Sequence, residues 1–527
     1  MPNQWLNFTV SGQLLELLNE AQANIRQGVE PKLLAQERVL LQQLNERAEQ
    51  QTRLLNGKNN VEQGAALQKE IDALTVEFQQ TKAQIRINSP RYVALTQSVS
   101  LTLQEIQRDL LDADTVLLEY ALGDERSYLW VVTSNTLTNY ELPKRTEIEK
   151  DVRRVVALLN DGKRWASDAR INAEYVEAAA PLTRTLLPPA LLSQLKGKRL
   201  VIVSDGALQY LPFGTLPQLQ GQQKTNSNRQ KAGIEPLVVS HEIISLPSAS
   251  TLTVLRRETA NRPPAAKSVA VFADPVFTDT DERLATIKAN QPKSNEQPKT
   301  DQSKSSKQIT NKLNSSRSFF ERAYNWNSES NEPLPISRLP FTRREAEAIL
   351  TLAPASSWMK AVDFKANRTT ALSSEMSQYR IVHFATHGLL HSEHPELSGI
   401  VLSLVNEQGQ PVDGFLRLNE IYNLNLSADL VVLSACETAL GKEIRGEGLI
   451  GLTRGFMYAG SPRVVASLWK VDDVATAELM KRFYQKMLQE KMRPAAALRA
   501  AKVEMWKQKR WNAPFYWAAF EIQGEWR

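Results

Sequence analysis

A single thiol and a histidine occupy similar places after two apolar segments. The chain of 527 residues has one cysteine, Cys436, which comes just after the run LVVLS at residues 430–434. His387 comes just after the run RIVHFA at residues 380–385, and the two residues are 49 positions apart. An imidazole can take the proton of a thiol and later protonate a leaving amine, so this pair could carry out nucleophilic catalysis. The alternative is that Cys436 is an inert buried side chain, as many lone cysteines are.

The segments before His387 and Cys436 have the features of buried parallel strands. Similar apolar runs of about five residues, each followed by a loop of small residues, occur in KRLVIVSDG, HEIISLPSAS and SVAVFADPVF. With helices between them, these runs are typical of a mostly parallel α/β sheet. Reactive side chains in such sheets gather in the loops beyond the carboxyl ends of the strands. The sequence therefore predicts that His387 and Cys436 lie at one edge of one sheet.

Three further histidines, His383, His391 and His394, lie within eight positions of His387. No cysteine partner or HExxH spacing accompanies them, so we expect no metal site. His383 falls inside the predicted strand, where we expect it to pack or to make a supporting hydrogen bond. We expect His391 and His394 on a solvated loop.

Residues 446–451, GEGLIG, have the GxGxxG spacing of a dinucleotide-binding loop, and Asp472 follows 21 positions later. In a true dinucleotide site the glycines directly follow a strand, whereas here they start well beyond the end of LVVLS. We therefore expect these glycines to allow a bend and close helix packing, and we expect no cofactor.

The chain divides into four regions by pattern. Residues 1–97 have apolar positions at heptad-like spacing with a turn-rich break, which predicts a helical hairpin or coiled-coil region. Residues 98–280 predict a first α/β half without a visible dyad, which we expect to act as a pseudo-protease scaffold. It begins with a hairpin in which TVLLEYAL and SYLWVVTS are joined by GDER. Residues 281–335 are polar and predict a disordered basic insertion, and residues 336–527 predict a second α/β half that carries His387 and Cys436.

Composition argues against several classes of protein. Residues 288–318 hold seven basic and two acidic residues, so this stretch accounts for nearly all of the net charge of +6 and no nucleic-acid groove is required. No apolar stretch approaches the length of a membrane helix, and we expect no membrane partner. The single cysteine and the lack of a secretory signal at the start favour the cytoplasm.

Several motifs together resemble one protein family. The runs HFATHG, LSACETALGKEIRGEGLIGLTRGFMYAG and RVVASLWKVDD closely resemble the CHAT domain, a caspase- and separase-like cysteine-peptidase family often found behind tetratricopeptide repeats. The resemblance extends from about residue 180 to 527, although no 34-residue repeat period is present. It implies a caspase-hemoglobinase fold. Together with the pattern along the chain, this predicts a mostly parallel sheet flanked by helices, in two halves, preceded by the N-terminal helical hairpin.

The resemblance also implies roles for particular residues. The family's His–Cys dyad maps onto His387 and Cys436, and the backbone N–H groups of Gly388 and Cys436 are the family-like donors to an oxyanion. Separase-like relatives keep an acid that meets a basic P1 side chain, and Asp473 matches its place better than Asp472. A carboxylate could bind an arginine there, but an acid at this point could equally cap the helix that follows.

Two functional interpretations remain open at this level. The first is a cysteine endopeptidase that hydrolyses polypeptides under the control of a regulatory protein partner, with cleavage after a basic P1 residue as the expected preference. In that case the N-terminal helices or residues 281–332 could gate the site, and self-cleavage within the insertion could activate it. The second is a non-catalytic caspase-like scaffold or signalling module that binds protein partners.

Overall fold

The computed structural model describes residues 30–37, scattered positions from 39 to 88, and residues 101–218, 235–290, 336–389, 399–434, 447–469 and 471–527. The chain forms two compact units, residues 1–100 and 101–527. In the first unit nearly all described residues are helical, and an ion pair of 3.0 Å joins Arg47 to Glu70. The helical character of this region is thus as expected where it is described, and the hairpin arrangement stays a prediction.

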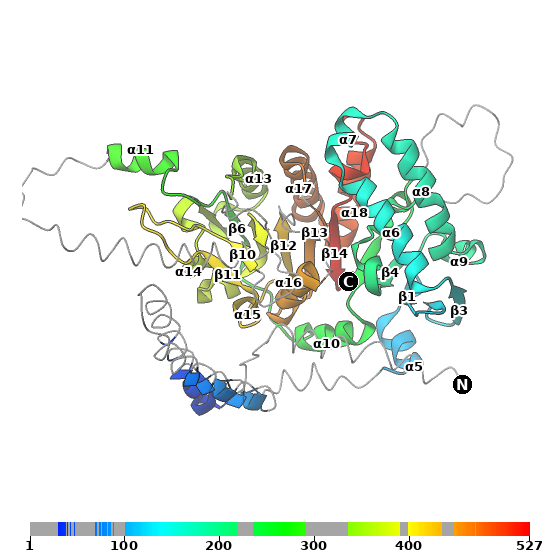
Figure 1. Cartoon of the computed structure of the whole chain (residues 1–527), viewed down its shortest axis with the longest axis horizontal. Helices are drawn as coiled ribbons and strands as arrows, with labels where there is room; N and C mark the ends of the chain where they lie inside the picture. The colour runs from blue at the N-terminus through cyan, green and yellow to red at the C-terminus, as the bar shows by residue number, and fades with distance from the viewer. Residues whose placement is uncertain are drawn as a thin grey trace, which may run out of the picture. The chain divides into compact units, whose positions relative to one another are not determined.

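The second unit is built on a large mixed sheet (Figure 1). Its strands are β1 (Thr115–Ala121), β2 (Ser127–Val132), β3 (Leu137–Leu142), β4 (Arg199–Val203), β5 (Ile243–Leu246), β6 (Lys267–Ala273), β7 (Trp358–Val362), β8 (Tyr379–Ala385), β12 (Leu430–Ser434), β13 (Arg463–Ser467) and β14 (Phe520–Gly524). They lie in the order β3-β2-β1-β4-β5-β14-β13-β12-β8-β6-β7. The central strands are Val-, Ile- and Leu-rich and buried on both faces, as parallel strands covered by helices must be.

The direction of the strands divides this sheet into two blocks. Strands β1, β4, β5 and β14 are parallel to one another, and so are β13, β12, β8, β6 and β7. The two blocks meet where β13 and β14 pair antiparallel. The carboxyl ends of the two blocks therefore lie at opposite edges of the sheet, so the loops that follow the strands of the first block lie away from the carboxyl edge of the second.

Helices cover both faces of the sheet (Figure 1). In the second block, α13 (Pro340–Leu350) and α17 (Asp473–Leu488) pack on the face to which His383 points, where its ring contacts Tyr484. The next residue of β8, Phe384, points to the other face and contacts Phe456 of α16 (Glu447–Tyr458). This alternation follows from the two-residue period of a strand. The remaining longer helices are α6 (Arg145–Asn160), α8 (Ile171–Leu186), α10 (Ala249–Thr259) and α18 (Pro494–Trp506).

The predicted fold class is confirmed: the structure is α/β, with a mostly parallel sheet flanked by helices. The hairpin of TVLLEYAL and SYLWVVTS is also confirmed, because β1 and β2 pair antiparallel from Leu117↔Val132 to Ala121↔Tyr128. A small antiparallel sheet of β9 (Gly388–Leu389), β10 (Gly399–Val401) and β11 (Phe415–Arg417) follows β8.

The predicted insertion is partly wrong at its start. Residues Glu282–Asn290 form helix α11, so disorder does not begin at residue 281. Asp281 and Arg283 are tied into a charged cluster, which supplies the ordering that composition alone did not indicate. Residues 291–335 lie outside the described part of the chain. The division at residue 280 stays a prediction. Strand β6 precedes residue 280 in the chain, and in the sheet it pairs with β8 and β7 of the second block.

Candidate active site

The register of two neighbouring strands relates His387 to the predicted position of Cys436. Strands β8 and β12 are adjacent and parallel, and Ala385 pairs with Ser434 at their carboxyl ends. His387 and Cys436 each come two residues after this matched pair. Cys436 itself lies outside the described residues, so the dyad stays a prediction, but the strand ends that precede its two members are side by side.

The ring of His387 is held by a backbone carbonyl. The histidine is 2% exposed, and its Nε2 lies 2.7 Å from the carbonyl oxygen of Ser337. Because a carbonyl can only accept, Nε2 must carry the hydrogen, and the lone pair of the neutral ring is on Nδ1. The ring also packs against Phe277, with 5.3 Å between the ring centroids. Thus Nδ1 is the atom with which His387 can take a proton.

Gly388 begins strand β9, and its neighbours are fixed by the small sheet. The carbonyl of His387 accepts from the backbone N–H of Val401 at 2.9 Å, and Thr386 Oγ1 donates to the carbonyl of Val401 at 2.6 Å. Gly388 pairs with Ile400 in the same sheet. The backbone around His387 is therefore rigidly supported, and the role of the Gly388 N–H as an oxyanion donor stays a prediction.

The two acids after β13 have different places. Asp472 is the N-cap of α17, and its side chain accepts a hydrogen bond of 2.8 Å from the backbone N–H of Ala475. This is the helix-cap alternative foreseen from the sequence, realised at Asp472. Asp473 is the first residue of α17 and half-buried, and its predicted role in binding a basic side chain remains untested.

His383 is fully buried in a polar network beneath the site. Its Nδ1 lies 2.9 Å from Tyr484 Oη, and its Nε2 lies 2.9 Å from Glu345 Oε1. The same carboxylate oxygen accepts a hydrogen bond of 2.6 Å from Ser434 at the end of β12. Burial raises the pKa of Tyr484 well above its ordinary value, so this hydroxyl stays protonated. The interpretation of His383 as a supporting residue inside the strand is confirmed, whereas His391 and His394 lie outside the described residues.

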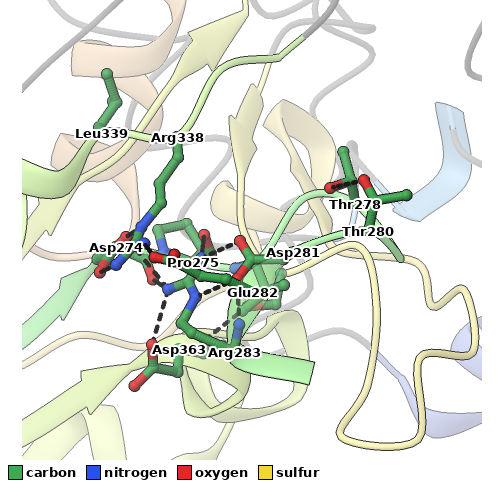
Figure 2. Close-up of polar contacts among 12 residues, drawn as sticks. Asp274, Pro275, Thr278, Thr280, Asp281, Glu282, Arg283, Arg338, Leu339 and Asp363 are labelled. Carbon is green, nitrogen blue, oxygen red and sulfur yellow. Dashed lines mark hydrogen bonds and ion pairs between the residues drawn. The ribbon is translucent and has the colours of Figure 1, made fainter. Parts of the chain in front are cut away.

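A charged cluster next to His387 was not foreseen from the sequence. It lies beyond the carboxyl ends of β6 and β7 and is centred on Asp274, whose side chain is 0% exposed (Figure 2). Arg338 donates to both carboxylate oxygens, Nε to Oδ1 and Nη2 to Oδ2, each at 2.9 Å. Arg343 Nε donates to Oδ2 at 2.9 Å. These bonds satisfy a carboxylate that could not otherwise remain buried and charged.

The cluster extends to a second carboxylate. Arg283 Nη1 donates at 2.7 Å both to the carbonyl of Asp274 and to Asp363 Oδ1, which Arg343 Nη2 also contacts (Figure 2). Asp274 and Asp363 directly follow β6 and β7, and both have positive φ angles, 47° and 53°. Non-glycine residues seldom adopt this conformation unless their surroundings impose it. The position of Asp274 just after an apolar strand, like that of His387, was the sequence signal that could have marked it.

The GxGxxG motif does not form a phosphate-binding loop in its described part. Gly448 and Gly451 lie within α16 (Glu447–Tyr458), while Gly446 falls outside the described residues. Within the part of the chain that the structure describes, no three His, Cys, Asp or Glu residues are grouped so as to hold a metal ion. None of the helices in the same part combines the length and apolar character needed to cross a bilayer.

Comparison with known proteins gives a family match over most of the second unit. The CHAT domain family matches residues 176–525, close to the span of about 180–527 expected from the motifs. Tetratricopeptide repeat protein 28 of Mus musculus is 33% identical over 109 residues, which are 21% of this chain and 4% of that protein. The Homo sapiens protein of the same name is 32% identical over 109 residues, again 21% of this chain and 4% of that protein. The chain thus matches only a small part of the length of these relatives.

Two solved structures show a weaker likeness. The Saccharomyces cerevisiae separase–securin complex is 10% identical, with a TM-score of 0.44, and the match covers 98% of this chain and 40% of that one. The Arg-specific cysteine proteinase gingipain R is 8% identical, with a TM-score of 0.33, over 72% of this chain and 75% of that one.

Proposed function

Because the chain belongs to the CHAT domain family, we propose that it is a caspase-like cysteine endopeptidase in which His387 and Cys436 form the catalytic dyad. The observation that carries this proposal is the pairing of Ala385 with Ser434, which sets the two strand ends side by side two residues before each member. The second support is the hydrogen bond from His387 Nε2 to the carbonyl of Ser337.

The hydrogen bond from Nε2 to Ser337 allows His387 to act as a general base. With the proton on Nε2, the neutral imidazole uses Nδ1 to accept the thiol proton of Cys436. The thiolate attacks the scissile carbonyl, and the resulting positive charge on the ring is stabilised by the carbonyl of Ser337. The backbone N–H groups of Gly388 and Cys436 are the proposed donors to the oxyanion.

Collapse of the tetrahedral intermediate completes the reaction. The protonated Nδ1 gives its proton to the departing amine, and an acyl-enzyme forms on the sulfur of Cys436. The same nitrogen then takes a proton from water, which attacks the thioester and releases the carboxylic acid.

For substrate choice, we propose that Asp473 binds a basic P1 side chain while Asp472 maintains the helix cap. The cap bond of Asp472 to Ala475 sets the start of α17, of which Asp473 is the first residue. A panel of fluorogenic peptides that differ at P1 tests this assignment. Asp473→Ala should reduce cleavage after arginine or lysine more than after other residues, and unchanged selectivity would contradict it.

Control of the activity is proposed to come from a protein partner, with residues 281–332 as a site of self-cleavage. Mass spectrometry of aged wild-type protein and of Cys436→Ala tests the second point. Fragments that are identical in the two samples would reject autoprocessing.

The central experiment uses the single thiol of the chain. Wild-type protein, Cys436→Ser and His387→Gln are incubated with a diverse peptide library and, separately, with a peptidyl acyloxymethyl ketone. We expect cleavage and covalent labelling in the wild type and loss of both in the two variants. Labelling that is absent in the native protein, or equal before and after denaturation, would instead support the scaffold interpretation.

A further inference from the structure

The carbonyl that holds His387 belongs to a peptide group fixed from both sides. On one side, Ile336 packs against an apolar cluster that contains Phe277. On the other, Arg338 makes its two-pronged contact with the buried Asp274 carboxylate. Ser337 lies between these anchors, and its carbonyl oxygen is 2.7 Å from His387 Nε2.

We propose that Asp274 and Arg338 are positioning residues for His387, which they orient through the carbonyl of Ser337. The carbonyl of Ser337 is part of the peptide bond to Arg338, so the orientation of that peptide depends on where the Arg338 side chain is held. The proposal rests on the proposed function of His387 as the base of the dyad. Figure 2 shows Arg338 reaching from its segment to Asp274.

The loop that begins at Asp274 supports His387 in a second way. Phe277, three residues further on, packs against the histidine ring. The backbone of this loop is fastened, because Val276 N–H donates to Ser403 Oγ at 3.1 Å and its carbonyl accepts from Leu404 N–H at 2.9 Å. Asp274 N–H donates to Thr342 Oγ1 at 3.0 Å. One loop therefore places both the aromatic contact and the clamp on Arg338.

Release of Arg338 has a predictable chemical result. The peptide between Ser337 and Arg338 gains freedom to turn, and Nε2 loses a carbonyl acceptor. The neutral ring can then adopt the other tautomer, with the lone pair on Nε2 and the hydrogen on Nδ1. In that state Nδ1 cannot accept the thiol proton, and catalysis falls although the substrate still binds.

Arg343 offers a matched control within the same cluster. It also donates to Asp274 at 2.9 Å, and its side chain is 29% exposed, against 32% for Arg338. It lies on α13, however, six positions from Ser337. Arg338→Met and Arg343→Met each remove one guanidinium partner of Asp274, but only the first change is adjacent to the carbonyl that contacts His387. In each variant the buried carboxylate of Asp274 keeps two guanidinium partners, Arg283 and the other arginine, so both variants are expected to fold.

The test measures the tautomer and the kinetics on the full-length protein. The ring nitrogens of His387 are followed by ¹⁵N NMR on protein labelled at histidine, with His387→Gln used for assignment. In Arg338→Met we expect ¹⁵N shifts that reveal loss of the Nε2–H tautomer. We also expect kcat to fall roughly ten- to hundredfold with KM little changed, because the charged ring loses one hydrogen bond, the bond from Nε2 to the carbonyl of Ser337. Arg338→Lys keeps the charge but cannot make the two-pronged contact with Asp274, so its kcat should lie between the values of the wild type and of Arg338→Met.

The outcomes separate this proposal from the proposed function. Wild-type nitrogen shifts in Arg338→Met overturn the positioning proposal, and so do equal changes in Arg338→Met and Arg343→Met. If Cys436→Ser cleaves peptides as the wild type does, the proposed dyad fails. The nitrogen shifts of His387 still decide the positioning proposal in that case, because they need no substrate.

Discussion

Glu119 provides a direct test of the energetics of the central sheet. It lies in β1 between Trp130 of β2 and Val203 of β4, and it is 3% exposed. Burial raises the pKa of this carboxyl from 4.5 to about 7, because the charged form is poorly solvated there. The perturbation we consider is Glu119→Gln, which keeps the shape and removes the titration.

The sign and size of the effect follow from proton linkage. Below pH 4.5 Glu119 is protonated in both the folded and the unfolded chain, so its titration adds no pH dependence. As the pH rises from 4.5 to about 7, the unfolded chain releases this proton first and becomes relatively more favourable. At about 1.4 kcal/mol for each pH unit, the free energy of unfolding falls by about 3 kcal/mol over this interval and then levels off.

The assay compares wild type and Glu119→Gln by urea unfolding at pH 5 and pH 8, followed by tryptophan fluorescence. Taking the difference between the two proteins at each pH cancels the other titrating groups. The variant should gain roughly 2 to 3 kcal/mol relative to the wild type between the two pH values. Glu141→Gln, on the partly exposed strand β3, is the control for loss of a surface carboxylate. A difference between Glu119→Gln and wild type that is the same at both pH values would refute the reasoning.

Three further predictions concern both blocks of the sheet and the helices that cover them. The carboxylate of Glu521 is buried 2.8 Å from Lys502 Nζ, and Lys502→Met leaves it without this partner. Thermal unfolding should show that the free energy of unfolding falls by about 3 to 5 kcal/mol. The double variant with Glu521→Met should largely restore it. Asp472→Ala should destabilise α17 by about 1 kcal/mol and Asp472→Ser should not, as measured by urea unfolding, with equal losses contradicting the cap. Phe384→Ala removes a ring stacked on Phe272 at 4.9 Å and should cost about 3 to 5 kcal/mol in the same assay, whereas a loss below 1 kcal/mol would show that the core repacks.

The residues of the candidate site that directly follow strands could be predicted from the sequence. An apolar run and the polar residue beyond it are local features, so His387, Cys436 and the α/β class could be predicted without coordinates. The helix-cap alternative at residues 472–473 was foreseen because capping also depends on adjacent residues, and the structure places the cap at Asp472.

The N-terminal limit of the predicted insertion shows where composition fails. Composition predicts disorder from residue 281 onward, yet residues 282–290 form α11. Arg283 bonds to Asp281 nearby and to Asp363, eighty positions away. Such distant partners supply ordering free energy that no local window contains.

The sequence by itself determined the strands, their small-residue ends and the two residue types able to form a dyad, because these are set by side-chain pattern over a few positions. Tertiary structure alone decided that the two blocks of the sheet run in opposite directions, through the antiparallel pair β13–β14. It alone placed the carbonyl of Ser337 against His387 and Arg338 against Asp274, contacts between residues 50 and 64 positions apart. Backbone carbonyls leave no signature in side-chain pattern, and an ion pair between distant residues forms only once the sheet has brought its strand ends together.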